Sequence, residues 1–577
     1  MMGRDSGFEY VVRRLTLLTC VLGSFLFAQI ALAAPVHVWE TVEITLHATE
    51  VHADPYAGSQ VWVDLEGPGF SKRCYGFWDG GSTFRVRVQA TAPGTWTWRS
   101  GSQFKDAGLA GTSGAFEAVP WTQAEKQANS NRRGQVRIAT DGRHFEYADG
   151  TPFFLLADTL WAGNTARCGL GDNQDGPFFQ YLADRRAKGF TAVLMQCIHG
   201  YGDYPDGQAH RNEGGYAFLD RNSARPNPAY FQALGRRMQV LREEGFVAAI
   251  PTMWWGKTKK PLFSPKDARR ISVYCAARYG TFNSLWSLSG EYQYTFRDCG
   301  WTPGDFSALG ADVQRHNPWN HPLSIHPSSG TYWETPHNRQ SSIAFHGEAW
   351  IDHHWLQTGQ SVDRLFNIVT RLAENRALEP AVPVFCSEAC YERASDRDSA
   401  SHTRWQVWAA FLNGAAGYGY GAHGIWQFLD PSDSKGEPGK MTKHPPVSWR
   451  EAIRLPGSAQ LRHARTLLTS LDWWRLKPRR DALQVDGQAN RLPTATDLTP
   501  PHVASIGNDT WVVYVPRGNE KRRIALSRDL VGSNRVRWFD PRRGQFQGRA
   551  ATLNEGTLPP RPAPADEDWV LLLEDTK

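Results

Sequence analysis

Two glutamates, Glu291 and Glu388, each stand three residues beyond a short apolar run that has the pattern of a buried strand. Carboxyl groups paired in this way can cleave a glycosidic bond, because one protonates the leaving oxygen while the other attacks the anomeric carbon or activates water there. Either glutamate alone could equally be a salt-bridged loop residue. Their occurrence at two separate strand ends favours catalysis. Glu392, four residues beyond Glu388, is the rival candidate for the attacking group.

The chain from about 135 to 475 alternates short apolar runs with amphipathic helical patterns. Eight repeats of this length predict a (β/α)8 barrel, whose active site lies at the carboxyl ends of the strands; a doubly wound open sheet is the alternative. Glu291 and Glu388 then follow the fourth and the seventh strand, at the mouth of the barrel. The expected strands span residues 153–157, 192–196, 247–251, 284–288, 322–325, 350–353, 382–385 and 417–425, and helical patterns include residues 178–188, 229–244, 362–375 and 402–412.

Other polar and aromatic residues near the predicted strand ends are candidates for binding the substrate. None is decisive alone, since Asp158 could instead cap a helix or pair with Arg167, and His423 could be a core histidine. The predicted substrate-binding residues are Asp158, Trp161, His199, Trp254, His326, Gln357, Tyr391, Glu392, Tyr420, His423 and Trp426.

Strand-like segments with period-two alternation lie on both sides of the barrel region. Residues 34–120 contain such segments between glycine-rich turns, and residues 476–577 return to the same pattern. Both regions predict antiparallel β-sandwiches, and the polar residues 121–134 predict a linker after the first of them. The expected architecture is multidomain, with a central (β/α)8 TIM barrel at 135–475 between two β-sandwiches.

The first 33 residues have the form of a secretory signal peptide. Arg13 and Arg14 precede an apolar run, and Ala31-Leu32-Ala33 places small residues at the positions that signal peptidase reads. We expect cleavage before Ala34 and a secreted or periplasmic protein with no membrane association after cleavage; an uncleaved anchor is the alternative. Without Cys20 the chain keeps seven cysteines, so at least one thiol is unpaired in an oxidising compartment, and the pairing stays open.

Composition narrows the class of partner. The net charge of +6 is spread along the chain, which argues against nucleic-acid binding. No cysteine spacing indicates a zinc site, and we expect no metal and no cofactor. Aromatic residues make up 12% of the chain, with 24 tryptophans, which is typical of proteins that stack on sugars, so a carbohydrate is the expected substrate. The sequence leaves the oligomeric state open.

Several motifs of the central region resemble those of the bacterial apiosidase-like glycoside hydrolases. Residues 36–118 resemble the sandwich domain that often precedes such barrels, and the tail around Trp538 to Gly544 resembles a collagen-binding-type domain that commonly follows them. The similar segments of the barrel are Phe153 to Trp161, Arg185 to Phe190, Asn227 to Phe231, Ser387 to Glu392 and Tyr420 to Phe428.

This resemblance implies a TIM barrel that hydrolyses glycosidic bonds with retention. It implies an acid/base at the end of strand 4 and a nucleophile at the end of strand 7, which match Glu291 and Glu388. The family pattern at strand 4 is Gly-Gly-Asp, whereas this chain has Ser289-Gly290-Glu291. Because a glutamate is longer than an aspartate by a methylene group, the sugar must sit differently or be a sugar other than apiose.

Two other functions fit the same observations. The enzyme could act on plant or microbial chains that contain arabinose, galactose or glucuronic acid. In a different class of protein, an inactive barrel could serve carbohydrate binding or adhesion without catalysis. The carboxyl groups at both strand ends argue against an inactive barrel, because such a barrel has no need of the pair.

Overall fold

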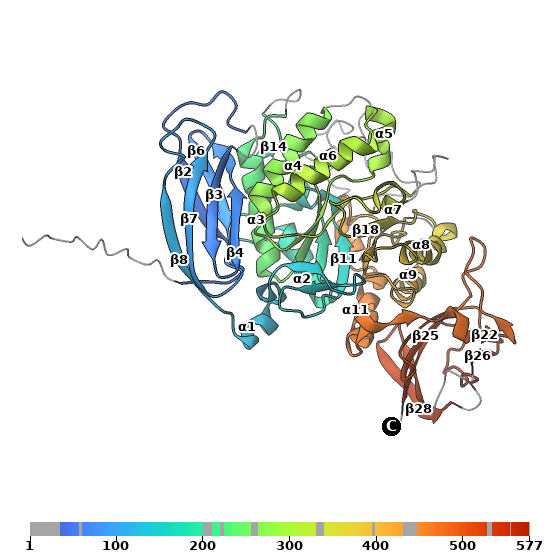
Figure 1. The fold of residues 1–577 in the computed structure, drawn as a ribbon. Coiled ribbons are helices and arrows are strands. Elements are labelled where there is room, and N and C mark those ends of the chain that lie inside the picture. The colour runs from blue at the N-terminus through green and yellow to red at the C-terminus, as the bar shows by residue number, and fades with distance from the viewer. Residues whose placement is uncertain are drawn as a thin grey trace, which may run out of the picture.

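The computed structural model describes residues 35–575, except for 57–59, 200–209, 220–223, 256–262, 330–339, 395–398, 431–446, 528–533 and 554–555. The expected signal peptide, residues 1–33, lies outside the described residues. Three units follow one another along the chain: an N-terminal pair of sheets, a central barrel and a C-terminal pair of sheets (Figure 1).

The N-terminal unit is a β-sandwich whose strands alternate between a buried and an exposed face. In β3 (Val61–Gly67), Val61, Val63 and Leu65 are buried while Asp64 is exposed, as period-two alternation requires. One sheet has the order β1-β8-β7-β3-β4 and the other β2-β6-β5, and the second sheet lies against two barrel helices, α3 and α4 (Figure 1). The remaining strands are β1 (Val36–His37), β2 (Val42–His47), β4 (Phe70–Tyr75), β5 (Phe77–Gly80), β6 (Thr83–Val88), β7 (Gly94–Ser102) and β8 (Ser113–Val119).

The segment 121–134, expected to be a linker, is folded. It contains α1 (Gln123–Ala128) and a 3-10 helix at Ser130–Arg133. The side-chain amides of Asn129 and Asn131 donate to a backbone carbonyl near the C-terminal end of α3. Because these bonds fix it on the barrel, the segment is a packed element and not a free connection.

Eight parallel strands form the central sheet and follow one another around a barrel. Their order, β17-β16-β15-β12-β11-β20-β19-β18, is the cyclic order of a (β/α)8 barrel and excludes the doubly wound alternative. The ring closes where the backbone N–H of Asp352, just before β18, donates to the carbonyl of Leu323 in β17 at 2.9 Å. The strands are β11 (Leu155–Thr159), β12 (Ala192–Leu194), β15 (Val247–Pro251), β16 (Ser284–Ser287), β17 (Leu323–Ser324), β18 (His354–Gln357), β19 (Val384–Glu388) and β20 (Gly417–Tyr420).

The sixth strand lies four residues later than the sequence pattern indicates. The pattern predicts it at 350–353, but β18 covers His354–Gln357. Trp350 is buried because it packs over Gly310 of helix α6 (Pro303–Arg315), where an added Cβ would lie 2.4 Å from its ring. The apolar run therefore belongs to the layer of helices and not to the barrel wall.

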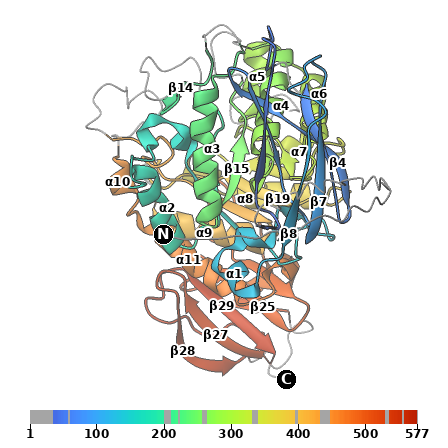
Figure 2. The same ribbon diagram turned by 90° about the vertical axis from the view of Figure 1, so that its left-hand side faces the viewer.

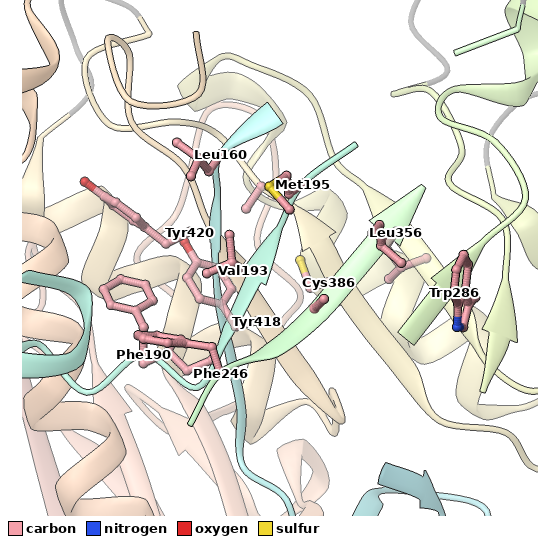
Figure 3. Close-up of a cluster of buried hydrophobic side chains, with 14 of the residues drawn as sticks. Leu160, Phe190, Val193, Met195, Phe246, Trp286, Leu356, Cys386, Tyr418 and Tyr420 are labelled. Carbon is pink, nitrogen blue, oxygen red and sulfur yellow. The ribbon is translucent and has the colours of Figure 1, made fainter. Parts of the chain in front are cut away.

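Side chains of the barrel strands divide between two cores. Those facing the axis, such as Leu155 and Phe385, form one cluster, which the hairpin of β9 (Val136–Ile138) and β10 (Phe145–Tyr147) extends. Those facing outward pack under the helices, and Figure 3 shows part of that cluster. Position along a strand thus decides which core a side chain enters. The barrel helices are α2 (Pro177–Ala187), α3 (Pro228–Glu243), α4 (Pro265–Tyr279), α5 (Tyr292–Cys299), α6 (Pro303–Arg315), α7 (Ser341–Phe345), α8 (Asn367–Arg376), α9 (Ala400–Leu412), α10 (Trp449–Ala452) and α11 (Pro456–Thr469).

The C-terminal unit consists of a six-stranded sheet, in the order β21-β24-β25-β29-β27-β28, and a three-stranded sheet, β23-β22-β26. The large sheet lies against α9 and α11 (Figures 1 and 2), and its outer side chains join the core of the helix layer. A buried ion pair crosses this contact, where the guanidinium of Arg404 in α9 donates two hydrogen bonds to Asp568. The strands are β21 (Lys477–Pro478), β22 (Leu483–Val485), β23 (Gln488–Ala489), β24 (His502–Ile506), β25 (Thr510–Val515), β26 (Ile524–Leu526), β27 (Asn534–Asp540), β28 (Gln545–Thr552) and β29 (Trp569–Asp575).

Arg404→Ala should lower the free energy of unfolding by about 3–5 kcal/mol, because Asp568 would stay buried without its cationic partner. Urea unfolding followed by tryptophan fluorescence measures this change. Arg475→Ala is the matched control, since its partner Asp472 is exposed and such surface pairs contribute about 0–1 kcal/mol. Equal effects of the two substitutions would contradict the view that the buried pair anchors the C-terminal unit.

Seven cysteines lie within the described residues, and none of them forms a disulfide. Burial raises the pKa of the Cys74 and Cys386 thiols to about 12 and that of Cys299 to about 11, so the reactive thiolate forms of these three are disfavoured. None of the described helices is both long enough and apolar enough to cross a membrane.

Candidate active site

Glu388 is turned into the barrel by an irregularity at the end of β19. Trp355 of β18 pairs with Phe385 and Gln357 pairs with Glu388, so three steps along β19 correspond to two along β18. Regular alternation would place Glu388 on the outer side with Cys386, whereas the additional residue returns it to the inner side with Phe385. A β-bulge of this kind commonly re-aims a side chain beside an active site.

Both carboxylate oxygens of Glu388 accept hydrogen bonds from side chains of neighbouring strand ends. His326 Nε2 donates to Oε2 at 3.0 Å, and the amide nitrogens of Gln357 and Gln360 donate to Oε1 at 2.8 and 2.9 Å. Glu388 is buried, with 7% of the residue exposed. The carboxylate of Glu388 is thus held by both of its oxygens inside the barrel.

Glu291 lies at the N-terminus of α5, shortly after β16. Its backbone is in the left-handed region, with φ at 37°, where the chain turns from strand into helix. Its Oε2 accepts a hydrogen bond from the indole N–H of Trp254 at 3.0 Å. Gly290 makes room for this indole, because a Cβ at position 290 would lie 2.1 Å from the ring. The glycine is therefore what lets Trp254 reach the carboxylate.

The two glutamates belong to one aromatic cluster. The ring of Trp254 lies 4.9 Å from that of Trp161 and 5.8 Å from that of His326, which holds Glu388. The hydroxyl of Tyr391 accepts from the indole N–H of Trp161 at 3.0 Å. Burial raises the pKa of Tyr391, and the negative charges of Glu388 and Glu291 add to that rise.

Six of the predicted substrate-binding residues meet in this cluster. They lie at or beyond the ends of strands 1, 3, 5, 6, 7 and 8, so six of the eight barrel strands contribute. The ring of Trp426 lies at the edge of the group, 6.4 Å from that of Tyr391. The six are Trp161, Trp254, His326, Gln357, Tyr391 and Trp426.

Asp158 lies outside the barrel wall, which corrects its expected role in substrate binding. It occupies an outward position of β11, and its carboxylate accepts from Tyr181 and Arg185 of helix α2. Burial raises the pKa of this carboxyl group, which Arg185 opposes. The partner of Asp158 is Arg185 and not Arg167, which is nearer in the sequence. Arg185 reaches Asp158 because α2 packs over the outer side of β11.

Tyr420 and Glu392 also lie in the helix layer rather than with the two catalytic candidates, and Figure 3 shows Tyr420 in the outer core. The Tyr420 hydroxyl donates to Glu392 at 2.6 Å, and the other Glu392 oxygen accepts from the backbone N–H of Gly457 at 3.0 Å. Gly457 stands in the first turn of α11, where a carboxylate is favoured by the helix dipole. Glu392 is therefore placed as a helix-capping group, which corrects its expected place in the site.

His199 and His423 are buried histidines of the loops that follow β12 and β20. The ring of His199 lies 6.4 Å from that of His210. His423 Nδ1 and the side-chain amide of Gln427 are 3.1 Å apart, and the backbone N–H of His423 donates to the carbonyl of Glu392 at 2.9 Å. These contacts tie both histidines to loops around the barrel mouth.

Gln360 is a residue of the site that the sequence pattern does not single out. It stands three residues beyond the end of β18, donates to Glu388, and accepts from the backbone N–H of Tyr391 at 2.8 Å. A sixth strand at 350–353, as the sequence pattern predicts, would end seven residues before Gln360, whereas β18 ends at Gln357. The correct strand position brings Gln360 into the range in which such residues are expected.

Within the described part of the chain, no group of three or more His, Cys, Asp or Glu side chains is arranged to hold a metal ion. The carboxylates of the cluster are held instead by imidazole, amide and indole N–H groups. The chemistry that these residues offer is proton transfer and nucleophilic attack by carboxyl groups.

A (β/α)8 barrel with two buried glutamates after strands 4 and 7, beside aromatic side chains, is the arrangement of a glycoside hydrolase. The family described as "Apiosidase-like, catalytic domain" matches residues 139–475, which is more than half of the chain. The protein therefore belongs to the apiosidase-like family, and it is a glycoside hydrolase. Residues 35–103 match a domain of unknown function, and residues 497–574 match a family described as "Putative collagen-binding domain of a collagenase".

Solved structures share the fold at low sequence identity. A protein described as a "putative glycoside hydrolase" from Bacteroides vulgatus is 18% identical, with a TM-score of 0.68 over 94% of this chain and 100% of that one. A glycoside hydrolase family 5 protein from Bacteroides vulgatus is 17% identical, with a TM-score of 0.62 over 78% of this chain and 95% of that one. No curated protein matches the chain.

Proposed function

We propose that the protein is an exported, retaining glycoside hydrolase that cleaves a plant or microbial poly- or oligosaccharide, with Glu388 as nucleophile and Glu291 as acid/base. The observation that carries this proposal is the pair of buried glutamates at two strand ends, linked through one cluster of aromatic and N–H-donating side chains. Retention follows the family resemblance and requires the carboxyl groups to stand roughly 5 to 5.5 Å apart.

The surroundings of Glu388 suit a nucleophile. A nucleophilic carboxylate must be aimed at the anomeric carbon, and the side chains of His326, Gln357 and Gln360 hold both oxygens of Glu388 in one orientation. Glu291 follows strand 4, where the family has its acid/base, and would first protonate the leaving oxygen and then activate water. Trp254 holds its carboxylate in place for both steps.

The cluster also offers groups that a sugar can use. Trp161 and Trp426 supply aromatic surface, which packs against the apolar faces of sugar rings. Gln357 Oε1 and His326 Nδ1 are buried acceptors for which the described residues provide no donor, and sugar hydroxyl groups could fill that place. Since Glu291 replaces the shorter aspartate of the family pattern, we propose a sugar other than apiose at this position.

The proposal is tested on protein recovered from the secreted or periplasmic fraction, with its N-terminus sequenced and the protein assayed on aryl glycosides and on pectic, hemicellulosic and arabinogalactan chains. We expect a mature N-terminus at Ala34 and a first-formed product with the anomeric configuration of the substrate, recorded by proton NMR before mutarotation. A product of inverted configuration would contradict the double-displacement mechanism. An N-terminus at Met1 would contradict export through cleavage of residues 1–33.

A further inference from the structure

Gln360 uses all the polar atoms of its amide on the segment that carries Glu388. Its Nε2 donates to Glu388 Oε1 at 2.9 Å and to the carbonyl of Ala389 at 3.2 Å, while its Oε1 accepts from the backbone N–H of Tyr391 at 2.8 Å. Because an amide holds its donors and its acceptor in one plane, a single side chain fixes both the carboxylate and the backbone that follows it.

The segment needs such support because it has left regular strand pairing. Pairing of β19 with β20 extends only to Cys386, and the bulge lies between Phe385 and Glu388. Two glutamines then hold the chain: Gln360 from the loop after β18, and Gln406 of α9, whose amide bonds both the N–H of Cys390 at 2.8 Å and its carbonyl at 3.1 Å. Gln360 alone of the two also donates to Glu388.

We propose that Gln360 is a positioning residue for the reaction, which keeps the Glu388 carboxylate oriented without touching the substrate. This inference rests on the proposed role of Glu388 as nucleophile. It extends that role, because Gln360 also fixes Tyr391, whose hydroxyl is bonded to Trp161 in the same cluster. One loop side chain thereby sets two residues of the site at once.

The other titratable and charged groups near Glu388 come from the elements around it. His326 donates to it from the loop after β17, and the negative charges of both Glu388 and Glu291 act on Tyr391. Arg371 of α8 reaches this region through a hydrogen bond to the carbonyl of Gln357. All of these groups remain in a Gln360 variant, so a changed pH profile reports the loss of the amide.

The test is the pH dependence of kcat/KM for Gln360→Leu and Gln360→Glu, measured on an aryl glycoside that the wild-type protein hydrolyses. Loss of one donor makes the Glu388 carboxylate easier to protonate, so the acidic limb should move to higher pH by about one unit. Gln360→Glu keeps the shape of the side chain but replaces a donor with an acceptor, and should move the limb at least as far.

Gln406→Leu is the matched control, because it releases the same segment at Cys390 but removes no donor from Glu388. It should lower the thermal unfolding temperature and leave the acidic limb in place. The inference is overturned if the limb stays unmoved in both Gln360 variants, or if Gln406→Leu moves it equally. Should Glu388→Ala keep wild-type turnover, the proposed function itself fails; should Glu388 be essential while the limb does not move, only the role of Gln360 fails.

Discussion

Glu388→Ala should lower kcat by about 10,000-fold or more on every substrate, because the substitution removes the atom that attacks the anomeric carbon. The loss should be similar for good and poor leaving groups, since no glycosyl-enzyme forms with either. Turnover numbers on an activated aryl glycoside and on a natural chain measure the effect. Circular dichroism should show an unchanged fold, because the neighbouring donors can bind water in the space that the side chain leaves.

Glu392→Gln is the control for this result. Glu392 accepts hydrogen bonds from Tyr420 and from the first turn of α11, and a glutamine keeps an acceptor oxygen there. We expect this variant to turn over substrate close to the wild-type rate. If Glu392→Gln abolished turnover while Glu388→Ala preserved it, the nucleophile would be Glu392 and the arrangement described for Glu388 would have another purpose.

Glu291→Ala should give the second large effect, and this one depends on the leaving group. Natural sugar leaving groups need a proton as they depart, so kcat/KM for them should fall by about 100- to 10,000-fold, whereas kcat/KM for activated aryl glycosides, which need little protonation, should be largely spared. Glu291 also activates the water of the second step, so hydrolysis of the glycosyl-enzyme should limit kcat on the aryl glycosides, and added azide should raise that kcat by attacking the glycosyl-enzyme in place of water. The basic limb of the pH profile, which reports the acid, should also flatten.

The role of Glu291 as acid/base is decided by comparing the loss of activity on natural substrates with the loss on activated aryl glycosides. A variant that slows both kinds of substrate by the same factor would show that Glu291 contributes to binding or folding and not to proton transfer. Trp254→Phe is an informative companion, because it removes the indole N–H that Glu291 accepts while keeping an aromatic ring over Gly290. Trp254→Phe should slow substrates with poor leaving groups more than activated ones. The difference should be smaller than for Glu291→Ala, because the carboxyl group itself remains.

The order of the barrel strands could be predicted from the sequence because each buried strand consists of a short apolar run between two helical patterns. The same reasoning misplaced the sixth strand, since Trp350 is apolar for a different reason: it fills the space over Gly310 in the helix layer. Apolar character alone does not tell a barrel wall from the layer around it. That distinction requires the contacts of the folded chain.

For single residues of the candidate site, too, the sequence pattern does not show whether a side chain faces the barrel axis or the helix layer. Proximity to a strand end selected Trp161, Trp254 and His326, which reach the cluster from loops. It also selected Asp158 and Tyr420, which stand within their strands on the outward side. A strand end brings a residue to the mouth of the barrel, but the alternation of side chains decides the side on which it lies.

The additional residue in β19 has a consequence for anyone who would transplant this chemistry to another scaffold. Copying Ser387 and Glu388 onto the end of a regular strand would point the carboxylate into the surrounding helices, because nothing would reverse the alternation after Phe385. A working graft has to carry the three-residue step opposite Trp355 and Gln357 as one unit. In this protein the direction of the Glu388 side chain is set by the backbone path as well as by the amino-acid type.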